Sequence, residues 1–212
     1  HFDPEYWIND GTEAVTVDGW EPDVQTDVAI EYIRTHREDP FFLAVSYGPP
    51  HNPYRAPERF LDSYEGRTLT ERPNVPPRAK KDEDQLLQYD AMVTSLDECV
   101  GRITKELDRL GIAEKTILVF TSDHGDMLGS QGHRLKQRPW EESINVPFII
   151  RYPEKIKAGL RRDWIVSSVD LMPTLLGLCG ANIPDKVQGF DQSEVFVGKS
   201  PETRDSAYLF NT

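Results

Sequence analysis

A carboxylate and an imidazole stand side by side in residues 122–129 (SDHGDMLG), as Asp123 and His124. This run follows residues 116–121 (TILVFT), a short uninterrupted apolar stretch that predicts a buried parallel strand. Because ligands in open α/β sheets bind beyond the carboxyl ends of the strands, this is a favourable place for a metal-binding pair. The competing interpretation is a turn in which both side chains only cap nearby backbone groups.

A second histidine, His51, follows another apolar stretch, residues 40–46 (PFFLAVS). The turn that carries it, residues 47–54 (YGPPHNPY), contains three prolines, which restrict the backbone around the imidazole. If the two predicted strands lie parallel in one sheet, His51, Asp123 and His124 emerge along the same edge. The alternative is a surface histidine in a proline-rich loop.

Lys136 lies in a positively charged segment, residues 132–138 (GHRLKQR), of an otherwise acidic chain. A lysine beside a metal pair suits an anionic substrate group such as sulfate or phosphate, because it stabilises charge on the oxygens. Basic clusters also occur as solvated surface, so this segment alone does not decide the chemistry.

Together these segments resemble the sulfatases, which belong to the alkaline phosphatase superfamily. The resemblance extends over roughly residues 20–198 and rests on several motifs in one order: PPHNPY at 49–54, TSDHGDMLG at 121–129, Lys136, EESINVPFIIRYP at 141–153, VDLMPTLL at 169–176 and VQGFD at 187–191.

The resemblance implies a role for four residues. Asp123 and His124 fall on ligands of the active-site divalent cation, usually Ca²⁺, with Mn²⁺ or Zn²⁺ as alternatives. Lys136 falls on the lysine that contacts the sulfate group. His51 falls near the leaving-group oxygen, as a proton donor or hydrogen-bond partner of the substrate.

The nucleophile of this family is a formylglycine, made from the first residue of a Cys/Ser-x-Pro/Ala-x-Arg motif. No such motif occurs in the 212 residues, and neither Cys99 nor Cys179 has the required neighbours. Cys99 lies in a helical pattern and is expected to pack in the core. We therefore expect residues 1–212 to be a partial sulfatase catalytic domain, without the nucleophile-bearing N-terminal segment and a C-terminal part, and inactive alone.

The sequence leaves open the identity of the metal and two further functions. Ca²⁺ prefers oxygen ligands whereas imidazole suits Zn²⁺ or Mn²⁺, so His124 leaves the metal undecided. The same Asp-His pair occurs in phosphonate monoester and phosphodiester hydrolases of the superfamily, which are the second candidate. The third is a non-catalytic piece that binds metal or sulfated glycan weakly.

Composition limits the partners. The net charge of −12 argues against nucleic acid or an anionic membrane surface, so an anionic substrate must be attracted by local cations. A sulfated small molecule or glycan is the expected substrate. No membrane-spanning run is visible, and the family resemblance favours a periplasmic or secreted protein.

The predicted fold class is α/β: three layers with a mostly parallel sheet flanked by helices, alkaline-phosphatase-like and incomplete. Exposed sheet edges in such a piece favour oligomers. Apolar spacing predicts a long helix over residues 84–110 that ends at Gly111. Four other elements are expected: a helix at 26–36 capped by Thr26, a surface loop at 63–83, a buried strand at 146–151 and a helix at 169–179. A last strand is expected at 206–210.

Overall fold

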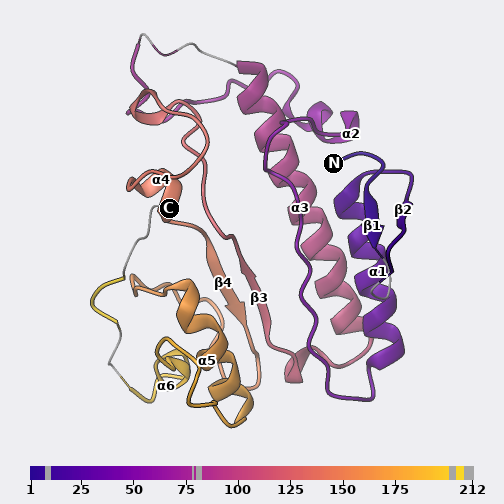
Figure 1. Cartoon of the computed structure of the whole chain (residues 1–212), viewed down its shortest axis with the longest axis vertical. Helices are drawn as coiled ribbons and strands as arrows, with labels where there is room; N and C mark the ends of the chain where they lie inside the picture. The colour runs from indigo at the N-terminus through magenta and orange to yellow at the C-terminus, as the bar shows by residue number, and fades with distance from the viewer. Residues whose placement is uncertain (8–10, 78, 80–82, 201–203, 208–212) are drawn as a thin grey trace. The chain divides into compact units, whose positions relative to one another are not determined.

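The computed structural model describes residues 1–7, 11–77, 79, 83–200 and 204–207 (Figure 1). The chain forms two compact units. Unit 1 comprises His1–Ala113 and Leu128–Gly132, and unit 2 comprises Glu114–Met127 and His133–Thr212. Among the described residues, no helix is long and apolar enough to cross a membrane.

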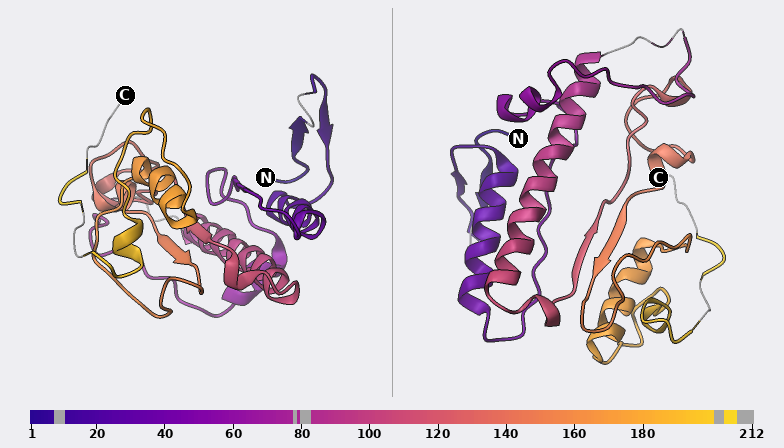
Figure 2. Two further views of the ribbon diagram at one scale, coloured as in Figure 1. Left: turned by 90° about the horizontal axis from the view of Figure 1, so that it is seen from below. Right: turned by 180° about the vertical axis from the view of Figure 1, so that it is seen from behind.

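Unit 1 is mainly helical. Its elements are β1 (Glu5–Trp7), β2 (Ala14–Thr16), α1 (Glu21–His36), α2 (Glu58–Leu61), the 3₁₀ turn η1 (Asp62–Tyr64), α3 (Glu83–Arg109) and η3 (Ser130–Gly132). Strands β1 and β2 form an antiparallel hairpin, with Tyr6 opposite Val15. Helices α1 and α3 pack side by side (Figures 1 and 2).

Helix α3 confirms the long helix expected from the sequence. Its buried positions recur every three or four residues, which places them on one face: Met92, Leu96, Cys99, Ile103 and Leu107. Gly111 follows with a φ of 72°, a left-handed conformation that glycine adopts readily after a helix. The expectation that Cys99 packs in the core is confirmed, since its side chain is fully buried.

Helix α1 begins five residues earlier than expected. Trp20 is its N-cap residue, and Pro22 in the first turn has the backbone angle that a helix start requires. Thr26 is therefore not a cap. It is completely buried inside the helix, and its hydroxyl lies 2.8 Å from the hydroxyl of Tyr47.

The strand expected at residues 40–46 is not formed. Within this segment, Phe41, Leu43 and Val45 are half-buried while the residues between them are exposed. This alternation is that of a strand. A strand also needs a hydrogen-bonded neighbour, and within the described part of the chain no backbone pairs with this segment.

In unit 2, the two strands at the centre are antiparallel rather than parallel. Strand β3 (Leu118–Thr121) pairs with β4 (Phe148–Arg151), with Val119 opposite Ile150. Both strands are shorter than expected, and Ile149 is 61% exposed, so β4 is covered on one face only. Parallel pairing was expected from continuous apolar runs, but such runs report burial and not strand direction.

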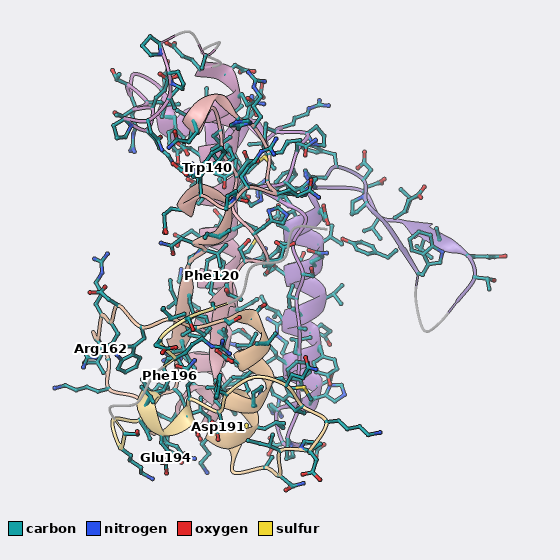
Figure 3. All side chains as sticks on the ribbon, turned by 60° about the vertical axis from the view of Figure 1, so that its left-hand side comes forward. Phe120, Trp140, Arg162, Asp191, Glu194 and Phe196 are labelled. Carbon is teal, nitrogen blue, oxygen red and sulfur yellow. The ribbon has the colours of Figure 1, made fainter. Side chains whose placement is uncertain are left out.

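The rest of unit 2 contains α4 (Glu141–Ile144), α5 (Ser168–Cys179) and α6 (Ser193–Phe196). The 3₁₀ turn η2 (Ala113–Lys115) joins the two units. Helix α5 begins one residue before its expected start, with Ser167 and Asp170 forming a capping box, and Gly180 ends it in a left-handed conformation. Phe196 of α6, which is labelled in Figure 3, packs against the rings of Phe148 and Trp164, with ring centroids 5.8 Å apart in each pair.

Two other segments were expected from the sequence, a surface loop and a last strand. The surface loop expected at 63–83 starts within η1, and the carbonyl oxygen of Asn74 accepts a 3.0 Å hydrogen bond from the amide of Gln131. The strand expected at 206–210 lies mostly outside the described residues, and its described part, Ser206 and Ala207, is not in a strand.

Candidate functional site

Asp123 and His124 lie two and three residues beyond the end of β3. The Nε2 atom of His124 is 3.5 Å from Oδ2 of Asp123, while Oδ1 of Asp123 accepts a 3.0 Å hydrogen bond from the backbone amide of His124. The Asp123 side chain is 84% exposed, so its carboxylate is accessible to a ligand. The two side chains thus present an oxygen and a nitrogen to one small volume.

The tautomer of His124 suits a metal ligand. Its Nδ1 atom lies 2.8 Å from the carbonyl oxygen of Gly125 and must donate a proton to it. In the neutral ring, Nε2 then carries the lone pair on the side of the Asp123 carboxylate. A lone pair and a carboxylate oxygen at 3.5 Å repel each other unless a positive charge lies between them.

The turn after His124 packs closely on α4. A Cβ atom on Gly125 would lie 2.1 Å from the carbonyl oxygen of Glu142, so only glycine fits here. The amide of Gly125 donates a 2.9 Å hydrogen bond to the carbonyl oxygen of Ser143, whose side chain is buried. The Asp-His pair is therefore held on a fixed backbone, which a metal site requires.

Lys136 is connected to the same turn. The amide of Met127 donates a 2.8 Å hydrogen bond to the carbonyl oxygen of Leu135, the residue before Lys136. Leu135 and Gln137, on either side of the lysine, have φ values of 61° and 65°. Non-glycine residues seldom adopt this left-handed conformation, and such strain is concentrated at functional sites.

His51 belongs to unit 1. The peptide bonds Pro49–Pro50 and Asn52–Pro53 are cis. The ring is exposed, and its Nδ1 lies 2.8 Å from the carbonyl oxygen of Asn52, so Nδ1 is the protonated nitrogen of the neutral ring. That His51 lies on one edge with Asp123 and His124 stays a prediction, and the parallel sheet from which it was argued is not present in the described residues.

The Asp-His pair offers two ligands for a cation. No cluster of three or more His, Cys, Asp or Glu side chains suited to a metal ion occurs in the part of the chain that the structure describes. The orientation of His124 Nε2 toward the carboxylate fits a divalent ion, and two donors are half or fewer of the ligands that such an ion takes. Further ligands are therefore required for tight binding.

Sequence reasoning missed the features that hold these side chains in place. The left-handed residues beside Lys136 have no signal in the sequence, because neither Leu nor Gln favours that conformation. The close approach at Gly125 had a signal, since a glycine directly after two candidate ligands often marks tight backbone packing.

Comparison with known proteins identifies the family. The sulfatase family profile matches residues 5–181, which is most of the chain. The chain belongs to the sulfatase family, and its structural neighbours include sulfatases with the alkaline-phosphatase-like fold.

Two curated sulfatases and one solved structure are similar to most of the chain. It is 37% identical to an ulvan-active sulfatase of Formosa agariphila, over 97% of this chain and 42% of that protein. It is 35% identical to an endo-4-O-sulfatase of Bacteroides thetaiotaomicron, over 95% of this chain and 42% of that protein. A solved structure from work on glycosaminoglycan metabolism by B. thetaiotaomicron is 34% identical, with a TM-score of 0.88 over 96% of this chain and 45% of that one. The chain thus spans less than half the length of these relatives.

Proposed function

We propose that the full-length protein containing this chain hydrolyses sulfate esters on a sulfated glycan. The observation that carries the proposal is the Asp123–His124 pair, held on the turn that also hydrogen-bonds the residue before Lys136, in a chain of the sulfatase family. The similarity to an ulvan-active sulfatase and an endo-4-O-sulfatase supports a polysaccharide substrate.

Each residue has a stated task in this proposal. A divalent cation held by Asp123 and His124 would neutralise charge on the sulfate oxygens. The ammonium of Lys136 stabilises negative charge that develops on the same oxygens. The imidazole of His51 donates a proton to the departing alcohol oxygen of the sugar. The formylglycine nucleophile is expected outside residues 1–212.

The test compares sulfate with phosphonate esters. Purified full-length protein is incubated with ulvan, chondroitin 4-sulfate and an aryl sulfate, and in parallel with an aryl phosphonate monoester, while released sulfate or phenol is measured. We expect sulfate release that stops when a chelator removes the divalent metal and returns when Ca²⁺ or Mn²⁺ is added. Faster turnover of the phosphonate would instead support a phosphonate monoester hydrolase. Absence of turnover on every ester would contradict the proposal.

A further inference from the structure

The His51 loop is connected to a second histidine, His1. The Nε2 atom of His1 lies 2.8 Å from the backbone carbonyl oxygen of His51. Its Nδ1 atom lies 2.8 Å from Oε2 of Glu21, in the first turn of α1. The two side chains are only 12% and 17% exposed, so this pair is largely shielded from water.

The partners of the His1 ring define its protonation. A carbonyl oxygen and a carboxylate are both acceptors, so both ring nitrogens must donate a proton. Only the imidazolium form has two N–H groups, and the Glu21 carboxylate provides the opposite charge beside it. A neutral ring keeps one of these hydrogen bonds and points a lone pair at the other acceptor.

The surrounding residues are shaped around this pair. A Cβ atom on Gly48 would lie 2.7 Å from Oε2 of Glu21 and 2.9 Å from Nδ1 of His1, so a side chain at this position would push the two groups aside. Gly48 in turn accepts a 3.1 Å hydrogen bond from the amide of His51. On its other side the His1 ring meets the edge of Trp20, which is buried in the core of unit 1.

The nearby charges are those of unit 1 itself. Glu21 is the carboxylate paired with the ring, and the phenol of Tyr6 is close enough to Glu21 to sense its charge. Burial raises the pKa of Tyr6, and the charge of Glu21 raises it further, so this phenol stays neutral. A backbone hydrogen bond also joins the two residues, since the amide of Glu21 donates to the carbonyl oxygen of His1 at 2.8 Å.

We propose that His1 and Glu21 are positioning residues that hold the His51 loop through the imidazolium bridge. The inference rests on the proposed function only in giving His51 the task of protonating the leaving alcohol. His1 does not contact the substrate in this scheme. It fixes the backbone on which His51 stands, and Glu21 keeps it doubly protonated.

Two substitutions of His1 separate its two hydrogen bonds in the full-length protein. In His1→Asn the amide nitrogen takes the place of Nδ1, so the contact with Glu21 remains and the one with His51 is lost. In His1→Gln the amide nitrogen takes the place of Nε2, so the contact with the His51 carbonyl remains. We expect His1→Asn to lose at least about tenfold in kcat on a sugar sulfate, a part of what a general acid contributes. His1→Gln should stay within about threefold of the parent, with KM unchanged in both.

Two leaving groups distinguish a role of His1 in positioning His51 from a general loss of enzyme activity. The comparison uses a sugar sulfate and nitrophenyl sulfate. A sugar alcohol needs a proton as it departs, whereas nitrophenolate is stable without one, so the loss in kcat should be confined to the sugar sulfate. A loss of equal size on both esters would overturn the inference. So would an unchanged rate on the sugar sulfate in His1→Asn.

A His51→Ala background separates this inference from the proposed function. His51→Ala alone should slow the sugar sulfate, and His1→Asn added to it should cost nothing more, because coupled residues are not additive. If His51→Ala has no effect, the proposed role of His51 fails. If His51→Ala has its effect and the double variant is slower by the full factor of His1→Asn, only the bridge fails.

Spectroscopy tests the bridge without activity. In the ¹⁵N-edited spectrum of histidine-labelled full-length protein, the His1 ring should show two protonated nitrogens at pH 7, and Glu21→Gln should convert it to one. A bare ring nitrogen on His1 in the parent protein would overturn the proposal. Where His1→Asn fails to fold, Gly48→Ala displaces the same pair by crowding it and should give the same loss on sugar sulfate. His36→Asn and Glu31→Gln on the exposed face of α1 are the matched controls, and neither should change the rate.

Discussion

The imidazole of His124 turns its Nε2 atom toward the carboxylate of Asp123, 3.5 Å away, because its Nδ1 atom is bonded to the carbonyl oxygen of Gly125. One backbone oxygen thereby selects the tautomer and the direction of the ring. The two donors face the same volume, and the backbone beneath them is fixed by the contact of Gly125 with α4. This relationship predicts how the site responds to a divalent metal.

Asp123→Asn should weaken metal binding in the full-length protein by at least about tenfold, because an amide oxygen lacks the charge that a hard cation prefers. The measurement is the rise in unfolding temperature with added Ca²⁺ or Mn²⁺, which follows the occupancy of the native protein. Asp126→Asn is the matched control, since Asp126 lies in the same turn and has no ligand role in our scheme. Equal losses in both variants would show that the turn binds metal only through its net charge.

Lys136→Ala should lower kcat on a sulfate ester strongly while the unfolding temperature stays unchanged. An ammonium that contacts the sulfate oxygens stabilises charge in the transition state, and removing such a group costs on the order of 3–4 kcal/mol. The neighbouring Arg138→Ala is the control, because Arg138 is exposed in the same basic segment. If both variants lose the same modest amount, Lys136 contributes only to a general positive field.

Helix α3 could be predicted from sequence almost to the residue, since its apolar spacing reports one buried face and Gly111 reports its end. The strand that pairs with β3 could not be predicted from the sequence. Residues 118–121 are apolar along their whole length, a pattern that indicates burial and leaves the direction and identity of the neighbouring strand undetermined.

The candidate site also has one part that the sequence predicts and one part that only the structure shows. Asp123 and His124 are adjacent in sequence, so their proximity followed from the motif. The link between Lys136 and their turn runs through a backbone hydrogen bond from Met127 to Leu135, and backbone hydrogen bonds leave no trace in side-chain identity. The bridge from His1 to the His51 loop spans 50 residues and could be found only in the structure.

Glu106 should make the stability of unit 1 sensitive to acid. Hydrogen bonds from Arg109 and Arg34 lower the pKa of this carboxyl from 4.5 to about 2. A carboxyl with a lower pKa in the folded state contributes stability above its unfolded pKa, and this contribution is lost as the pH falls from about 4.5 toward 2. Urea unfolding of the full-length protein should therefore show that the free energy of unfolding falls less between pH 7 and pH 3 in Glu106→Gln than in the parent.

The control for Glu106 is Glu31→Gln. Glu31 is 67% exposed and lies 3.7 Å from Arg34. Its substitution should therefore leave the change in unfolding free energy between pH 7 and pH 3 as it is in the parent. Because Arg34 and Arg109 are themselves about half exposed, the difference between Glu106→Gln and the parent should shrink at high salt. An identical acid response in all three proteins would show that Glu106 titrates alike in the folded and unfolded states.

Arg204→Met should strongly destabilise unit 2, because the Arg204 side chain is only 9% exposed and is paired with Asp170. The Nε and Nη2 atoms of Arg204 donate hydrogen bonds to Oδ2 and Oδ1 of Asp170, at 2.8 and 2.7 Å. Asp170 is completely buried at the start of α5. Burial alone would raise the pKa of Asp170, but the hydrogen bonds from Arg204 and from the amides of Phe190 and Ser167 lower it, so the carboxylate is charged.

Removing the arginine leaves that charge buried without a cation, which costs about 3–5 kcal/mol. Methionine keeps much of the apolar contact with Phe190, whose ring lies 4.7 Å below the guanidinium of Arg204, so the loss reports the charge rather than a cavity. Arg204→Lys should restore part of the stability only, because one ammonium cannot bond both oxygens in the same way. In Asp170→Asn combined with Arg204→Met, the loss measured by urea unfolding of the full-length protein should be smaller than the sum of the two single losses. Strict additivity, or a loss below about 0.5 kcal/mol in Arg204→Met, would mean that the Asp170 carboxylate is not anchored by Arg204 in solution.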